Sequence, residues 1–89
     1  MISRPMKGFW EAYDRLPDHV HRQARSAFDR WRDDPFRSSL EFKKIHGSAD
    51  LWSVRVGIAW RALAYRRGNA AHWFWIGSHA EYNRIIRTK

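Results

Sequence analysis

The sequence predicts an α+β fold, in which an N-terminal helical hairpin packs on a small antiparallel sheet of about four strands and a short C-terminal helix follows. Apolar residues recur at helical spacing before residue 34, alternate with polar ones after residue 51, and form an almost unbroken run at 71–76. The stretch from Leu51 to Tyr82 holds four of the six tryptophans and organises the rest of the chain. At 89 residues, the chain is expected to form one domain, residues 1–89.

Two helices are expected in the first third of the chain. Phe9, Tyr13 and Leu16 fall at i, i+4 and i+7 and predict a short helix over 7–16. Pro17 interrupts it and suits the first turn of a second helix over 17–33. That helix carries the clearest apolar stripe in the sequence, made of Val20, Ala24, Ala27, Phe28 and Trp31. Residues 1–6 are expected to be a frayed lead-in, because a proline at position 5 opposes regular structure.

Four strands and a last helix are expected after residue 38. The segment SLEFKKIHGS predicts a first strand, residues 52–57 a half-buried second one, 59–66 a third and 71–76 a central fourth. Turns are expected at Gly57 and at Arg67-Gly68-Asn69. A helix from His79 to Thr88 is expected to turn Tyr82, Ile85 and Ile86 inward. The sheet is thus predicted to have one packed face and one positively charged face.

The charge is unevenly distributed along the chain. The net charge is +8, but residues 1–34 carry seven Lys/Arg and six Asp/Glu, whereas residues 35–89 carry ten Lys/Arg and three Asp/Glu. A positive field confined to the predicted sheet favours an anionic partner, either nucleic acid or an acidic protein. The simpler alternative, that basic residues only keep the protein soluble, does not account for this segregation.

The composition also excludes several classes of site. The chain has no cysteine, so it has neither disulfides nor thiolate metal ligands. It shows no signal-peptide pattern and no apolar run of about 18 residues, which favours a soluble, cytoplasmic protein with no membrane partner. The histidines show no metal-ligand spacing, and no Gly-rich phosphate loop is present. Neither a metal nor a cofactor is therefore expected.

Four motifs in order make the chain similar to a known family. L-x-F-K-K, W-S-V-R-V-G, W-R-A-L-x-Y and W-F-W-I-G-S-H-x-E-Y follow the helical hairpin. Their order and spacing resemble the RelE/ParE superfamily, the toxins of type II toxin–antitoxin modules, and the likeness extends from about Phe9 to Ile86. The resemblance implies a small α+β toxin domain and a cognate antitoxin that is acidic or partly disordered.

The resemblance leaves two functions open. RelE-like members are metal-independent endoribonucleases that cut mRNA, usually on the ribosome, whereas ParE-like members inhibit DNA gyrase without catalysis of their own. In the nuclease branch, Arg55 and Arg61 would bind and stabilise the phosphate, His79 would be the acid or base, and Tyr82 would match a C-terminal tyrosine. Whether the chain is an enzyme therefore stays open.

Two departures from the nuclease pattern stand out. Some nuclease members carry a lysine where this chain has Ser53, so Lys43 and Lys44 on the preceding strand are expected to supply that charge and to hold the RNA backbone. Many members also begin with a strand that Met1–Met6, short and broken by a proline, are not expected to form, which predicts a sheet smaller by one strand.

The residue types fit the chemistry of RNA cleavage, although each has a structural alternative. Guanidinium groups bind phosphate oxygens in pairs, and histidine exchanges protons near neutral pH. Arg55 and Arg61 have alternative roles as ion-pair partners of acidic residues, for which the candidates are Glu41, Asp50 and Glu81. His79 has the alternative role of a turn or cap residue, and Tyr82 that of a core residue.

Overall fold

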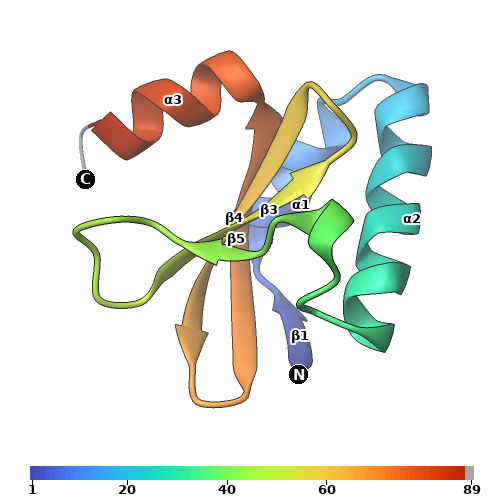
Figure 1. The fold of residues 1–89 in the computed structure, drawn as a ribbon. Helices are drawn as coiled ribbons and strands as arrows, with labels where there is room; N and C mark the ends of the chain where they lie inside the picture. The colour runs from blue at the N-terminus through green and yellow to red at the C-terminus, as the bar shows by residue number, and fades with distance from the viewer. Residues whose placement is uncertain (88–89) are drawn as a thin grey trace.

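The computed structural model describes residues 1–87, in which three helices and one short 3₁₀ turn accompany a five-stranded sheet (Figure 1). In chain order, the elements are β1 (Ile2–Pro5), α1 (Lys7–Asp14), α2 (Asp18–Asp33), the 3₁₀ turn η1 (Ser38–Leu40), β2 (Lys43–Lys44), β3 (Leu51–Val56), β4 (Trp60–Arg67), β5 (Ala70–Ser78) and α3 (His79–Arg87). The α+β class and the helical hairpin are confirmed.

The sheet is mixed rather than wholly antiparallel, and it has one strand more than the sequence predicts. Its order is β1-β5-β4-β3-β2, and β1 runs parallel to β5 with Ile2 opposite Ala70 and Pro5 opposite Trp73. The prediction of a frayed lead-in was wrong because a proline is tolerated in an edge strand, where one missing donor costs little. Backbone bonds from Ile2 to Asn69 and from Met6 to Trp73, both 2.8 Å, fix the two ends of this strand.

The first strand expected from the sequence, SLEFKKIHGS, was wrong over most of its length. Residues 38–40 form the 3₁₀ turn, and Glu41 takes a left-handed conformation with φ of 45°. Only Lys43 and Lys44 pair with β3, opposite Ser53 and Trp52 respectively. A bend in the left-handed region cannot be read from hydrophobic periodicity, which here continued through Leu40 and Phe42.

The remaining strands and helices lie close to their predicted positions. The turns at Gly57 and Gly68 both have positive φ, of 62° and 58°. The fourth predicted strand extends to Ser78 and lies inside the sheet between β1 and β4, as expected. The predicted end of the last helix, Thr88, lies outside the described residues.

The core fills the face of the sheet that α1 and α2 cover. Trp31 of α2 and Trp73 of β5 are almost completely buried and contact each other edge to face, with ring centroids 5.4 Å apart. Phe28 and Phe42 pack against Trp73, and Phe9 of α1 packs against Phe28. Helix α3 lies on the opposite face and contains no fully buried residue. The two faces of the sheet are therefore covered very differently.

Candidate functional site

The start of α3 is fixed by a reciprocal cap at its junction with β5. The Ser78 hydroxyl accepts the backbone N–H of Glu81 at 3.1 Å, and the Glu81 carboxylate accepts both the backbone N–H and the hydroxyl of Ser78, at 3.3 and 3.0 Å. This Ser-x-x-Glu pattern is a capping box. Because β5 passes directly into α3, it sets His79 and Tyr82 in the first turn of the helix, over the sheet. Glu81, an alternative partner for the arginines, is occupied by this cap.

Two arginines lie directly opposite each other on the α3 side of the sheet. Arg55 of β3 and Arg61 of β4 are register partners across the antiparallel pair. The Glu41 carboxylate lies between them, 3.3 Å from Arg55 Nη1 and 3.9 Å from Arg61 Nη2, and 3.8 Å from Lys43 Nζ. The structure therefore confirms the alternative role of both arginines as ion-pair partners of Glu41. Asp50, another candidate partner, pairs with Arg67 instead.

Glu41 is a site residue that the sequence analysis named only as an ion-pair partner. Its left-handed backbone conformation ends η1 and turns its side chain towards three cations. A non-glycine residue in this region costs about 1–2 kcal/mol. Strain of this kind gathers at functional sites. The left-handed φ of Glu41 and its contacts with three cations identify it as a site residue, and neither feature is visible in the sequence.

A cavity of about 320 Å³ opens beside this carboxylate. It lies between the β2 edge of the sheet and α3, and its lining is Glu41, Lys43, Lys44, Ile45, His46, Ser53, Arg61, Tyr82 and Ile86. Four predicted site residues, Lys43, Lys44, Arg61 and Tyr82, thus surround one space. Arg55 is not among the lining residues, but it contacts Glu41, which lines the cavity.

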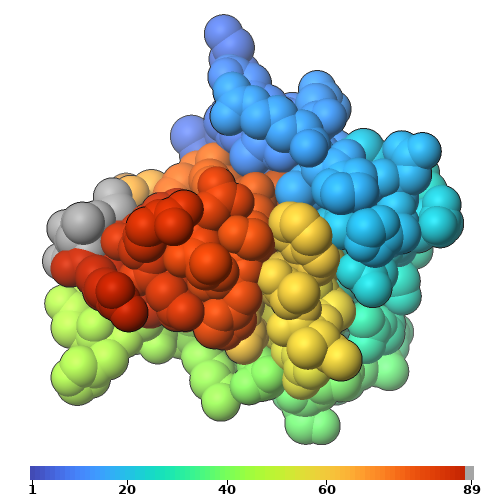
Figure 2. Space-filling model, turned by 90° about the horizontal axis from the view of Figure 1, so that it is seen from above, coloured from blue at the N-terminus to red at the C-terminus, as the bar shows by residue number. Residues whose placement is uncertain are grey.

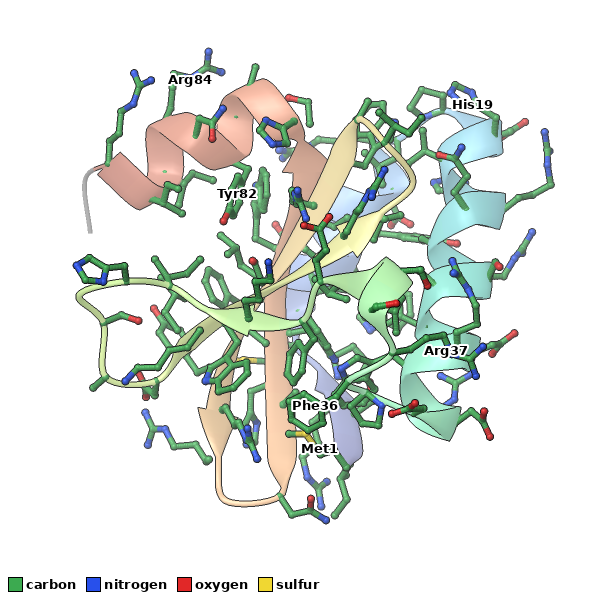
Figure 3. The ribbon with its side chains drawn as sticks, viewed as in Figure 1. Met1, His19, Phe36, Arg37, Tyr82 and Arg84 are labelled. Carbon is green, nitrogen blue, oxygen red and sulfur yellow. The ribbon has the colours of Figure 1, made fainter. Side chains whose placement is uncertain are left out.

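Tyr82 projects from α3 towards the sheet, as Figure 3 shows, and its hydroxyl donates to the Ser53 hydroxyl at 3.4 Å. Its ring also lies under the Arg61 guanidinium, with the cation 5.8 Å from the ring centroid. Ser53 is 5% exposed, so the position where some relatives carry lysine is a buried contact of Tyr82. Lys43 stands opposite Ser53 in the neighbouring strand, which brings a lysine to the same place from β2.

His79 stands apart from the residues that line the cavity. Its ring lies 5.7 Å from the Tyr82 ring, on the side of α3 where Asn83 follows one turn later. The Asn83 side-chain amide lies 3.1 Å from Nδ1 and holds the ring at that nitrogen. The backbone N–H of His79 bonds to the Ala59 carbonyl at 2.8 Å. Asn83 was not predicted, although its i+4 spacing from His79 is the available signal.

Arg61 has the least satisfied side chain of the cluster. It is only 16% exposed, and its buried Nε has no hydrogen-bond partner within residues 1–87. Its nearest acidic oxygen, at 3.9 Å, is too far for a hydrogen bond. A mostly buried guanidinium that lines a cavity, with no carboxylate of residues 1–87 close enough for a hydrogen bond, is suited to bind an anion.

Comparison with known proteins shows the family of this chain. The family model described as a ParE-like toxin domain matches residues 18–84, which include α2, the central strands and most of α3. The chain belongs to this family. It is therefore a toxin domain of the RelE/ParE superfamily, as the motifs indicate.

Solved structures of toxins share the fold of this ParE-like toxin domain. The RelB–RelE antitoxin–toxin complex from Methanococcus jannaschii has a TM-score of 0.75 at 16% identity, covering 92% of this chain and 96% of that one. The YoeB/ParE toxin from Agrobacterium tumefaciens gives 0.67 at 16% identity over 89% and 99% of the two chains. The isolated E. coli RelE toxin gives 0.66 at 10% identity over 99% and 98%. At these identities, the likeness shows the fold.

No curated protein is significantly similar in sequence to this chain. Within residues 1–87, none of its helices has the length and apolar character that a membrane span requires. The same residues contain no cluster of three or more His, Asp or Glu side chains able to hold a metal ion.

Proposed function

We propose that the chain is the toxin of a toxin–antitoxin pair and that it cleaves RNA in the cavity between the β2 edge and α3. Arg61 carries this proposal, because its mostly buried guanidinium, which has no carboxylate of residues 1–87 within hydrogen-bond distance, lines a space already flanked by two lysines. Phosphate is the anion that such an arrangement suits best. The net charge of +8 gives the protein the field needed to attract a polyanion.

In this proposal, the cations hold the scissile phosphate and stabilise the charge that develops on it. Arg61 and Lys44 bind the non-bridging oxygens, while Arg55 and Lys43 complete the positive field around Glu41. Preorganised cations act strongly on a phosphorane, since its additional negative charge appears only in the transition state. The Arg61 guanidinium gains hydrogen-bond acceptors when phosphate oxygens replace the Glu41 oxygen, which at 3.9 Å is too far away for a hydrogen bond.

The proton transfers fall to Glu41 and His79. The 2′-hydroxyl oxygen attacks the adjacent phosphorus, its proton passes to the Glu41 carboxylate, and the bond to the 5′ oxygen breaks. His79, as the imidazolium, gives its Nε2 proton to that leaving oxygen and becomes neutral, so the products are a 2′,3′-cyclic phosphate and a 5′-hydroxyl end. The Asn83 side-chain amide holds the ring at Nδ1, which leaves Nε2 as the atom that donates. No metal takes part in this scheme.

Tyr82 links the two halves of the proposed site. Its ring centroid lies 5.8 Å from the Arg61 guanidinium carbon and 5.7 Å from the centre of the His79 ring. An aromatic ring in this position stacks on an unpaired base and keeps the neighbouring phosphate aligned. RNA, rather than DNA, is the substrate because the reaction requires a 2′-hydroxyl.

The proposed partner is a cognate antitoxin with an acidic, partly disordered segment. The similar toxin from Methanococcus jannaschii is seen in an antitoxin–toxin complex. A segment that folds on binding covers a large surface and masks its charge. Such a chain would neutralise the Lys43, Lys44 and Arg61 cluster while the toxin is held inactive.

The test is inducible expression in bacteria, followed by mapping of RNA 5′ ends. Wild type is compared with His79→Ala, and with Arg84→Gln as a matched control that removes an exposed charge elsewhere on α3. We expect growth arrest with new 5′-hydroxyl ends inside translated messages, lost in His79→Ala and kept in Arg84→Gln. Arrest with intact RNA, or arrest unchanged in His79→Ala with cuts still present, would contradict the assignment.

Inhibition of DNA gyrase is the second candidate, and a specific observation favours it. Glu41 already partly neutralises Arg55, Arg61 and Lys43, which leaves the cluster less free for phosphate than three unpaired cations would be. The matching family model is also described as ParE-like. A supercoiling assay with the purified protein separates the two functions: inhibition at stoichiometric protein supports the gyrase function, and full gyrase activity argues against it.

A further inference from the structure

A second groove, distinct from the cavity, runs along one flank of α2. Its volume is about 410 Å³, and its lining consists of His19, Arg22, Gln23, Ser26, Arg30 and Gly57. These helical positions repeat at intervals of three and four residues, so they form one stripe. At 1.5 Å per residue, the stripe from His19 to Arg30 is about 16 Å long. Figure 3 shows His19 at the end of α2 nearest the β3–β4 turn.

The acidic residues of α2 are paired on other flanks of the helix. Asp18 lies 3.9 Å from His21, Asp29 pairs with Arg32, and Asp33 pairs with Arg37 at 2.9 Å. None of them lines the groove. Within residues 1–87, Arg22 and Arg30 form no ion pair with a carboxylate, and the Arg30 guanidinium bonds only to the Ser26 carbonyl and the Ser39 hydroxyl. The groove therefore carries uncompensated positive charge.

Arg55 joins this groove to the proposed catalytic cavity. Its Nε donates to the carbonyl of Gly57, which lines the groove, at 3.0 Å, and its Nη1 lies 3.3 Å from Glu41, which lines the cavity. Gly57 is packed against α2, since a Cβ there would come within 2.9 Å of Gln23 Oε1. In Figure 2 the β3–β4 turn, coloured yellow, lies between α3 and the first half of α2. Arg55 thus contacts one lining residue of the groove and one of the cavity.

We propose that the α2 groove binds the phosphodiester backbone of the same RNA strand that enters the cavity, several nucleotides away from the scissile phosphate. This inference rests on the proposed function and assigns it an extended single-stranded substrate. Side-chain cations, hydroxyls and amides are the groups that hold nucleic-acid backbones without reading sequence. The groove therefore increases the affinity for RNA and fixes the position of the strand relative to the cavity, whereas the cavity performs the cleavage.

The lining favours RNA backbone over an acidic protein segment. Protein segments that dock stably bury apolar or aromatic anchors in the centre of the contact. All six residues of this groove are polar or glycine, so it offers no pocket for such an anchor. A phosphate backbone needs only the charges and donors that the groove supplies.

The test is equilibrium binding of fluorescent 2′-O-methyl RNA, which cannot be cleaved, measured by anisotropy at several salt concentrations. Two oligonucleotides of one repeated sequence are compared, of about four and about twelve nucleotides, which cover the usual range of single-strand site sizes. The variant is Arg22→Gln/Arg30→Gln. The matched control is Arg25→Gln/Arg32→Gln, which removes two charges from the same helix outside the groove.

We expect wild type to bind the long oligonucleotide at least about tenfold more tightly than the short one. The groove variant should lose most of that advantage and lower the slope of log K against log salt by about 1.4, or about 0.7 per lost phosphate contact. It should bind the short oligonucleotide as wild type does, and the control should behave like wild type with both.

Three results would overturn the inference. The first is an equal loss of affinity for the long and the short oligonucleotide in the groove variant, and the second is no loss of affinity in that variant. The third is that the groove variant loses more affinity for poly-glutamate of matched charge than for RNA, which would identify the groove as a protein-binding surface. The binding assay uses RNA that cannot be cleaved, so it does not depend on the ribonuclease function. If that function is wrong, unmodified RNA stays intact while the length-dependent binding of the 2′-O-methyl probe is unchanged.

Discussion

The two faces of the sheet differ in what they bury. On the face covered by α1 and α2, Trp31 and Trp73 are at most 1% exposed and sit in a continuous aromatic cluster. On the face covered by α3, the sheet presents Ser53, Arg55 and Arg61, and the covering helix buries no residue fully. The first face is packed like the interior of a small domain, whereas the second combines buried Leu51 and Leu63 with charged side chains and a cavity.

This difference indicates that one face of the sheet mainly stabilises the fold and the other mainly forms the candidate site, in a chain too small for two large cores. Burial of large aromatic side chains supplies most of the stabilisation available to an 89-residue domain. The α3 face buries Leu51 and Leu63 but also accepts a left-handed Glu41 and a cavity, each of which costs stability. The account predicts that substitutions on the two faces act on different properties.

Trp73→Ala should have the largest effect on stability. Removing a fully buried tryptophan leaves a cavity and costs about 3–5 kcal/mol, a large share of the stability of a small domain. Chemical denaturation of the purified protein measures the loss. A change below about 1 kcal/mol would mean that the aromatic cluster does not hold the fold.

Ser78→Ala should have a smaller effect, confined to the α3 face. It breaks the capping box with Glu81 and should cost about 1 kcal/mol. Because the same cap sets the first turn of α3, cleavage should fall more than the loss of folded protein explains. Ala80→Gly, at an exposed position in the same turn, is the control for a local loss of helix stability. Equal effects of both changes on cleavage would argue against a positioning role for the cap.

Glu41→Gly should be more stable than Glu41→Ala by about 1 kcal/mol, because glycine adopts the left-handed region without a Cβ penalty. Both changes remove the carboxylate, so the comparison isolates the backbone. Thermal unfolding at matched pH gives the difference. If alanine were the more stable of the two, the conformation at this position would not be strained.

Tyr82→Phe should have the smallest effect on stability, within about 0.5 kcal/mol, since it removes one long hydrogen bond to Ser53. Tyr82→Ala should lower affinity for unpaired RNA by about 1–3 kcal/mol through lost stacking, while Tyr82→Phe keeps it. Binding of 2′-O-methyl RNA by the two variants measures both. If the two bind equally well, Tyr82 serves only the packing of α3.

The sequence predicts the packed face better than the polar one. The stripe from Val20 to Trp31 and the apolar run of β5 are periodic signals, and the structure follows both. β1 was missed because its pairing with β5 is a long-range contact, formed in spite of Pro5. Lys43, Lys44, Arg61 and Tyr82 do line one cavity, but Glu41 and Asn83 depend on a left-handed turn and on tertiary packing. Hydrophobic patterns carry no information about either.

The measurement that tests the central claim most directly is single-turnover cleavage of RNA by purified wild type and Glu41→Gln, with the unfolding free energy of both determined in parallel. Glutamine keeps the size of the side chain but accepts no proton. The account predicts a loss of about 10²–10⁴-fold in cleavage rate with less than about 1 kcal/mol change in stability. Cleavage at the wild-type rate, or a rate that falls only with the folded fraction, would contradict the assignment of the α3 face to catalysis.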